Sequence, residues 1–198
     1  LAAPYTSTRL PGYIPRPATP NDYFVAADNG AGYLMPGMLQ EPREISGLKS
    51  GLDAWAKHCT PYYNRWDLTI TGFVIDGTAP GLTKEGLDCY ASFSPDGIVP
   101  QKVPLTVLHG NMPVLRSDED IQQNPKEAAQ RVAQRVSERP IPFHWFRNIL
   151  KTPDWYVTVT EELGKLNPDI ELLDAPTFFE LYRIWLHQNP DAATGKIK

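Results

Sequence analysis

Short apolar runs alternate along this chain with longer stretches in which apolar residues recur every three or four positions. Runs of about four to eight apolar or β-branched residues predict buried strands, and the wider spacing predicts helices that bury one face. Capping residues mark helix starts, as at Thr83 and at Asn124, which is followed by Pro125. Strands are predicted at 23–27, 68–75, 98–101, 104–108, 141–146 and 170–173, and helices at about 46–59, 83–91, 124–139, 152–167 and 177–185.

This alternation predicts an α/β protein with a parallel sheet covered by helices. A closed (β/α)8 barrel takes about 250 residues, whereas this chain has 198. The sheet is therefore either open or part of a barrel, and we predict parallel βα repeats of a partial or complete TIM-like barrel. Residues 1–20, with five prolines, are predicted as an extended arm, 21–190 as the barrel-like domain and 191–198 as a flexible tail.

The composition is that of an ordinary globular protein, with 41% hydrophobic and 21% charged residues. The net charge of −4 is unlike a nucleic-acid-binding surface, and no apolar run reaches the roughly 18 residues of a membrane span. We therefore expect neither kind of partner. Since the first residues lack an initiator methionine and a signal-peptide layout, we expect a chain processed or cut from something larger. Cys59 and Cys89 are predicted to be small buried hydrophobes, with a disulfide as the alternative.

Five of the apolar runs stop at a side chain capable of acid–base or metal chemistry. In α/β proteins, functional sites are built at the carboxyl ends of parallel strands. If the five ends share one rim, three carboxylates and two imidazoles face a common site. These residues are Asp28, Asp76, His109, His144 and Asp174.

Each of these five side chains also has a structural interpretation. The aspartates precede turns or a helix start, where a carboxylate accepts backbone hydrogen bonds, and either histidine could be a hydrogen-bonded structural residue. Three neighbours could contact a substrate: Asn29, Gln101 and Arg147. Arg147 could also pair with a carboxylate across the rim. The acidic run 118–120 lies in a loop before a helix and is expected to be solvated.

The loop after the first predicted strand carries the most specific motif, Gly30-Ala31-Gly32-Tyr33-Leu34-Met35-Pro36. Its two glycines permit positive φ and close backbone approach, so that Tyr33 can project from a tight loop. The loop lacks the GK[ST] of a phosphate loop and the third glycine of a dinucleotide fingerprint. It resembles the motif of the GxGYxYP family, whose members are grouped with glycoside hydrolase and carbohydrate deacetylase barrels. Met35 stands where that family has its second tyrosine.

The resemblance extends over about residues 22–187 and corresponds to the later half of the family's barrel. Family members are longer, with an N-terminal domain and earlier barrel strands. The resemblance therefore implies a carbohydrate ligand and, as a further partner, the remainder of a larger polypeptide or another subunit. We also expect an extracellular or periplasmic location.

These observations together predict a carbohydrate-active enzyme, a glycoside hydrolase without a cofactor. Such enzymes use two carboxylates, about 5–5.5 Å apart for retention and about 6.5–9.5 Å apart for inversion. Asp28 and Asp76, on successive predicted strands, are the predicted acid–base pair. The residues predicted to contact the sugar are Asn29, Tyr33, Gln101, His109, His144, Arg147 and Asp174.

Two alternatives stay open. One is a metal-dependent carbohydrate esterase or deacetylase that uses His109, His144 and an aspartate as metal ligands. The other is a sugar-binding or structural fragment without catalytic activity. The favoured interpretation assigns no metal ligand.

Overall fold

A single four-stranded sheet organises the molecule. The computed structural model describes residues 19, 22–43 and 45–197. The strands lie in the order β1 (Ile70–Val74), β2 (Gly97–Pro100), β4 (Met112–Leu115) and β3 (Thr106–His109). β1, β2 and β4 are parallel, and β3 is antiparallel to β4. The described part of the chain is therefore a mixed α/β structure with an open, mostly parallel sheet.

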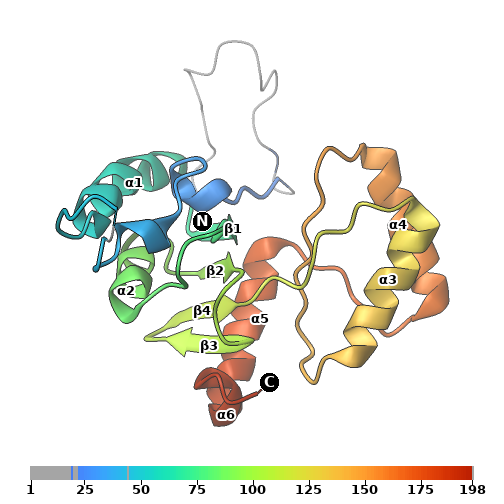
Figure 1. Ribbon diagram of the computed structural model, residues 1–198. Helices are drawn as coiled ribbons and strands as arrows, with labels where there is room; N and C mark the ends of the chain where they lie inside the picture. The colour runs from blue at the N-terminus through green and yellow to red at the C-terminus, as the bar shows by residue number, and fades with distance from the viewer. Residues whose placement is uncertain (1–18, 20–21, 44, 198) are drawn as a thin grey trace.

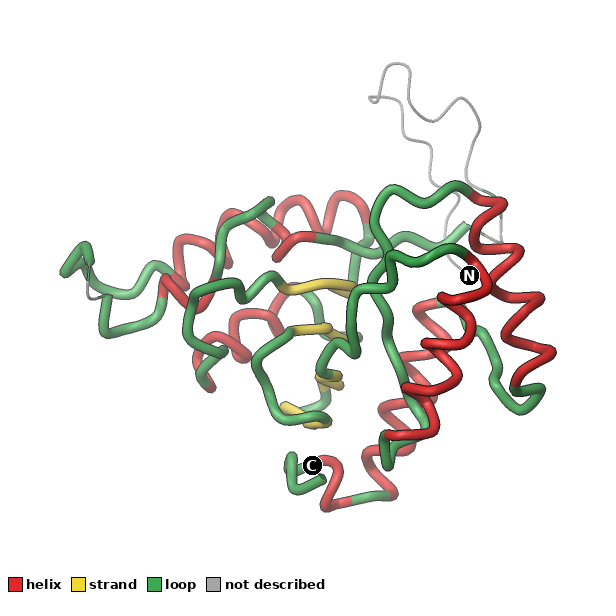
Figure 2. The backbone as a smooth tube through the Cα atoms, turned by 45° about the vertical axis from the view of Figure 1, so that its right-hand side comes forward, coloured by secondary structure: helices red, strands yellow, loops and turns green. Residues whose placement is uncertain are grey.

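Helices lie on both sides of this sheet (Figures 1 and 2). Their bounds are α1 Leu52–Trp66, α2 Lys84–Phe93, α3 Pro125–Glu138, α4 Pro153–Leu166, α5 Ala175–Gln188 and α6 Pro190–Ala193, with two 3-10 turns, η1 Asp28–Gly30 and η2 Pro36–Leu39. α1 and α2 pack together on one side, whereas α5 contacts β3 and β4. α3 and α4 lie side by side next to the sheet and run in the same direction, joined by the long segment 139–152 (Figure 1).

β1, β2 and β4 are buried on both faces, whereas the edge strand β3 is buried only at Thr106. Neighbouring strand residues therefore enter different cores. Ile98 and Val114 belong to the core under α1 and α2, while Val99 and Leu115 belong to the core under α5. None of these four side chains is exposed to solvent.

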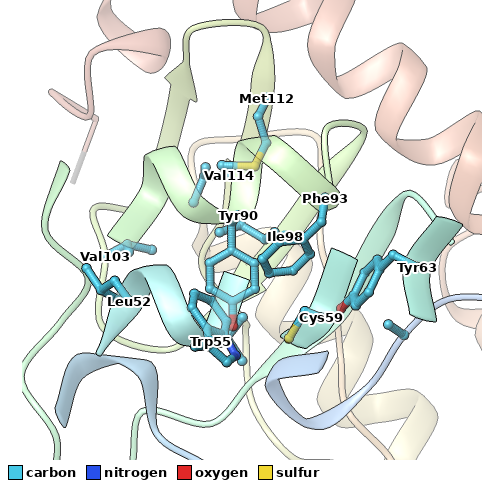
Figure 3. Close-up of a cluster of buried hydrophobic side chains, with 12 residues drawn as sticks. Leu52, Trp55, Cys59, Tyr63, Tyr90, Phe93, Ile98, Val103, Met112 and Val114 are labelled. Carbon is cyan, nitrogen blue, oxygen red and sulfur yellow. The ribbon is translucent and has the colours of Figure 1, made fainter. Parts of the chain in front are cut away.

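Aromatic rings fill the core under α1 and α2 (Figure 3). The Trp55 ring meets Tyr90 and Phe93 edge-on at centroid distances of 4.8 and 5.2 Å, and Tyr63 meets Phe93 at 4.7 Å. Such edge-to-face pairs add to the stabilisation from apolar burial. Cys59 lies among these rings as a free thiol, and its burial raises its pKa to about 11. Cys89 is also free, so the alternative of a disulfide is not realised.

Three predicted strands are absent from the sheet, and one strand was missed. The segment 23–27 contributes one parallel bridge, between Ala26 and Thr71. The segments 141–146 and 170–173 are extended loops, and the only ladder contact near the first is a bridge between Asp120 and Arg147. β4 was not predicted because its four residues include Pro113. With an open sheet and an antiparallel edge strand, the described residues do not form the predicted TIM-like barrel.

The helix predictions are confirmed in kind and position, although α1 begins at Leu52 rather than near Ser46. Most of the predicted arm lies outside the described residues, and the predicted tail contains most of the short helix α6. No described helix combines the length and the apolar character needed to cross a bilayer.

Candidate functional site

The loops that follow β1, β2 and β4 leave the same edge of the sheet, because these strands are parallel. We call it the carboxyl edge. Ala26 pairs with β1 in the same direction, so the loop after it, with η1 and Tyr33, also emerges there. Asp28, Asp76 and Gln101 therefore belong to one edge, as predicted. The acidic run 118–120 joins them, because it follows β4.

His109 lies at the other end of the sheet. It is the last residue of β3, and the antiparallel direction of β3 places that end beside Met112, the first residue of β4. There the Nε2 of His109 is 2.7 Å from an Asp88 carboxylate oxygen. The prediction that all five strand-end residues share one rim is therefore wrong for His109.

Asp76 links the ends of β1 and β2 and is only 1% exposed. Its Oδ2 accepts the backbone N–H groups of Gln101 and Lys102 at 2.8 and 2.7 Å. Its own N–H donates to the side-chain oxygen of Gln101 at 3.1 Å. Its Oδ1 is buried without a hydrogen-bond partner among the described residues. Burial is the main cause that raises the pKa of Asp76, against the opposing effect of the two backbone N–H groups.

We expect the Asp76→Asn variant to gain stability relative to the native protein as the pH rises. Since the pKa of Asp76 is raised by folding, the native state binds its proton more tightly than the unfolded chain, whose carboxyl has a pKa of 3.8. The stability from this proton is present below that value and is lost as the pH rises through the raised pKa. Melting temperatures measured from about pH 3.5 to 7 test this. Asp53→Asn, which removes an exposed carboxylate, is the control. The prediction is contradicted if the melting temperature of Asp76→Asn falls relative to that of the native protein as the pH rises.

Asn29 fixes the glycine-rich loop to the end of β1. Its side chain is fully buried; Oδ1 accepts the N–H of Ile75 at 2.5 Å, and Nδ2 donates to the carbonyl of Leu34. Its backbone is left-handed, with φ of 68°, a conformation that asparagine tolerates better than most residues. Asn29 therefore shapes the loop from which Tyr33 projects, 80% exposed.

Three charged or polar side chains lie near Arg147 at the carboxyl edge, and one of them contacts it directly. Arg147 makes a two-pronged ion pair with Asp120, in which Nε donates at 2.7 Å. Its guanidinium lies 4.1 Å above the Phe73 ring of β1. The pKa of Arg147 is raised, first by the bond to Asp120 and further by the negative charge of Asp28, while Tyr33 lies in the same neighbourhood. We call Asp28, Tyr33, Asp120 and Arg147 the Arg147 cluster.

His144 is a structural residue in this arrangement. Its Nε2 donates to the carbonyl of Ile141 at 2.9 Å, and its Nδ1 lies 3.4 Å from Asp118. The fully buried side chain of Asp118 also lies 2.7 Å from Arg139 and accepts the N–H of Trp145 at 2.8 Å. The interpretation of the acidic run as solvated is wrong for Asp118, which is buried. Glu119 is partly exposed and Asp120 is exposed, and they pair with Arg131 and Arg147.

Asp174 caps a helix. Its carboxylate accepts the N–H and the hydroxyl of Thr177, both at 2.9 Å, and so begins α5. This is the structural interpretation considered for Asp174 from the sequence.

A cavity of about 710 Å³ lies between α3, α4, the segment 142–148 and the loop 167–173. Its lining is mostly apolar, and His144 is the one predicted site residue in it. Phe143 and Trp145, which also pack on Phe178 of α5, line it together with His144 and Phe146.

No group of three potential metal ligands is present among the described residues. The ligand set of the predicted metal-dependent esterase does not come together, because His109 and His144 lie in separate contacts with Asp88 and Asp118.

The sequence matches the model of one protein family over residues 10–183, under the description GxGYxYP putative glycoside hydrolase C-terminal domain. The chain belongs to this family. No curated protein and no solved structure matched the chain. The motif of the GxGYxYP family is the loop at the carboxyl edge, and Met35, in place of its second tyrosine, packs against Gly77 in the loop after β1.

Proposed function

We propose that this domain takes part in glycoside hydrolysis and binds carbohydrate at the Arg147 cluster. The observation that carries the proposal is the ion pair of Asp120 with Arg147 beside the loop that carries Asp28 and the exposed Tyr33. Family membership supplies the reaction class. Paired carboxylates and an exposed aromatic ring are the groups that glycoside hydrolysis and sugar binding use.

Asp28 is the proposed reacting carboxylate. It is partly exposed and accepts no hydrogen bond from another described residue, so it is free to exchange a proton with a substrate oxygen. Asp120, across Arg147, is the proposed second carboxylate, which is a change from the pair predicted from the sequence. Asp76 serves better as the link between β1 and β2, because one of its oxygens is already bound by two backbone N–H groups.

Tyr33 is the proposed contact for a sugar ring. Its side chain is 80% exposed, so its ring is not stabilised by packing against the protein and is available to a ligand. A ring held on a loop fixed by Asn29 offers a flat face to the C–H groups of a pyranose. Arg147 keeps donors free beyond those that bind Asp120, and these donors suit sugar hydroxyls.

The proposal is tested by hydrolysis of a panel of aryl glycosides and by binding of oligosaccharides in ligand-observed NMR. We expect Asp28→Asn to lower kcat/KM by about 100-fold or more, the range for loss of a general acid or base, while leaving binding in place. Tyr33→Ala is expected to weaken binding about 10-fold. Asp76→Asn should keep its activity, because its oxygen can still accept both backbone bonds.

Asp53→Asn and Tyr62→Ala are matched controls, since both replace exposed side chains of α1. They should leave activity and binding unchanged. Absence of sugar binding by the intact chain, or equal effects of Tyr33→Ala and Tyr62→Ala, overturns the proposal. A loss of activity in Asp76→Asn comparable to that in Asp28→Asn would instead return Asp76 to the catalytic pair.

A further inference from the structure

A second, polar hollow lies at the edge of the sheet opposite the Arg147 cluster. Its volume is about 340 Å³, and it lies where α2, the turn between β3 and β4, and α5 meet. A hollow of this size accommodates a small molecule. Its polar lining residues are Asp88, Asp96, His109, Asn111 and Arg183.

His109 is held in this hollow with one ring nitrogen free. Its Nε2 donates to Asp88 at 2.7 Å, and no described residue bonds to its Nδ1. A carboxylate in this position fixes the orientation of the imidazole. Asp88 in turn is paired with Lys84 at 2.8 Å, and these two partners, Lys84 first, lower the pKa of Asp88. The negative charge of Asp88 is therefore already balanced.

Arg183 brings a cation to the hollow from α5. Its one ion pair among the described residues is a single 3.3 Å contact with Asp96, which leaves most of its five N–H donors unused. The side chain is 23% exposed, so its guanidinium is fixed in place but reachable from solvent.

The turn between β3 and β4 adds backbone donors. Gly110 has φ of 60° and open space around it, and no described residue accepts a hydrogen bond from the N–H of Gly110 or Asn111. The side chain of Asn111 accepts from His187 at 3.4 Å, which orients the amide at the rim of the hollow. The His109 ring, the Arg183 guanidinium and the N–H groups of the turn thus surround one space. The two carboxylates beside it are already paired, Asp88 with Lys84 and Asp96 with Arg183.

We propose that this hollow is a binding site for a small molecule through an oxyanion group, either a phosphoryl or a carboxylate group, held between His109 and Arg183. Arg183 donates charge-assisted hydrogen bonds, and His109 donates through Nδ1 in its protonated form, since its Nε2 already donates to Asp88. Unpaired turn N–H groups provide further donors, as in other anion-binding concavities of protein backbones. The site is independent of the proposed hydrolase site, because the two lie at opposite edges of the sheet.

The test is an NMR titration of the intact chain with inorganic phosphate and, separately, with acetate and glucuronate. We expect saturable shifts at the His109 ring and at the backbone amides of Gly110 and Asn111. His109→Gln and Arg183→Gln should each weaken binding about 10-fold, the scale of a lost charge-assisted hydrogen bond. Tighter binding of phosphate identifies the bound group as phosphoryl, and tighter binding of acetate or glucuronate identifies it as a carboxylate.

His58→Gln and Arg65→Gln are the controls, because they remove the same types of side chain from the exposed face of α1. The amide spectrum of each variant reports whether its fold is intact. Shifts that do not saturate with any of the three anions overturn the proposal. The proposal is also overturned if His58→Gln and Arg65→Gln weaken anion binding as much as His109→Gln and Arg183→Gln do. Equal effects would mean that the anions are attracted by overall charge alone.

Discussion

Replacing Asp118 with alanine is expected to lower the free energy of unfolding by about 3–5 kcal/mol, because it leaves a buried cation without its partner. Asp118 Oδ1 lies 2.7 Å from Arg139 Nη1, and Oδ2 accepts the N–H of Trp145. The Asp118 side chain is fully buried and that of Arg139 is 9% exposed, so water cannot take the place of the lost carboxylate. Burial, the largest cause, already lowers the pKa of Arg139. Urea denaturation followed by circular dichroism measures the effect.

Two further variants make the measurement specific to the buried pair. Asp169→Ala removes an exposed carboxylate and should change the free energy of unfolding by less than about 0.5 kcal/mol. The double variant Asp118→Ala/Arg139→Met should recover part of the loss, because neither charge then remains buried alone. If Asp118→Ala is as stable as Asp169→Ala, the carboxylate does not stabilise this region.

Replacing Asn29 with alanine is expected to cost about 3 kcal/mol or more, from two separate causes. The N–H of Ile75 and the carbonyl of Leu34 lose their hydrogen-bond partner, at about 1–3 kcal/mol for each group that stays unsatisfied. The left-handed backbone, with φ of 68°, costs alanine a further 1–2 kcal/mol or so. Because Asn29 shapes the loop that carries Tyr33, sugar binding should weaken as well.

The variant Asn29→Gly separates these two causes, since glycine adopts positive φ readily. It should be about 1 kcal/mol more stable than Asn29→Ala, while still lacking both side-chain hydrogen bonds. Asn64→Ala, on the exposed face of α1, is the control and should be near neutral. Equal stabilities of the alanine and glycine variants would mean that the backbone conformation carries no cost.

The helices could be predicted from the sequence because their signals are local. Asn124 and Asp174 accept the capping hydrogen bonds of α3 and α5, and Thr83 caps α2. The apolar spacing of α1 matches its buried face, formed by Leu52, Trp55, Cys59 and Tyr63. Such signals depend on residues within one or two turns.

The strands were harder to predict, because an extended loop buried on both sides has the same pattern as a strand. In the segment 143–147, Phe143 and Trp145 pack against Phe178 of α5, and both also line the cavity beside α3 and α4. The segment is held by packing against apolar surfaces and not by a ladder of hydrogen bonds.

The candidate site was predicted in part. The glycine-rich loop and Arg147 come together at the carboxyl edge, but the partner of Arg147 is Asp120, which the sequence offers only as one of three adjacent acids. The position of His109 depends on the direction of β3, and a two-residue turn between β3 and β4 is the sole sign of that direction in the sequence.

The two outer strands of the sheet, β3 and β1, differ in whether a further strand could pair with them. β3 closes one edge, where α6 packs against it and Thr106 donates its hydroxyl hydrogen bond to the carbonyl of Ala192. The β1 edge carries the bridge to Ala26 as its one pairing among the described residues. A strand from elsewhere in a longer polypeptide would therefore join beside the segment of Ala26, next to the loop of Asp28 and Tyr33. Extension of the sheet there would place new side chains next to the proposed sugar site.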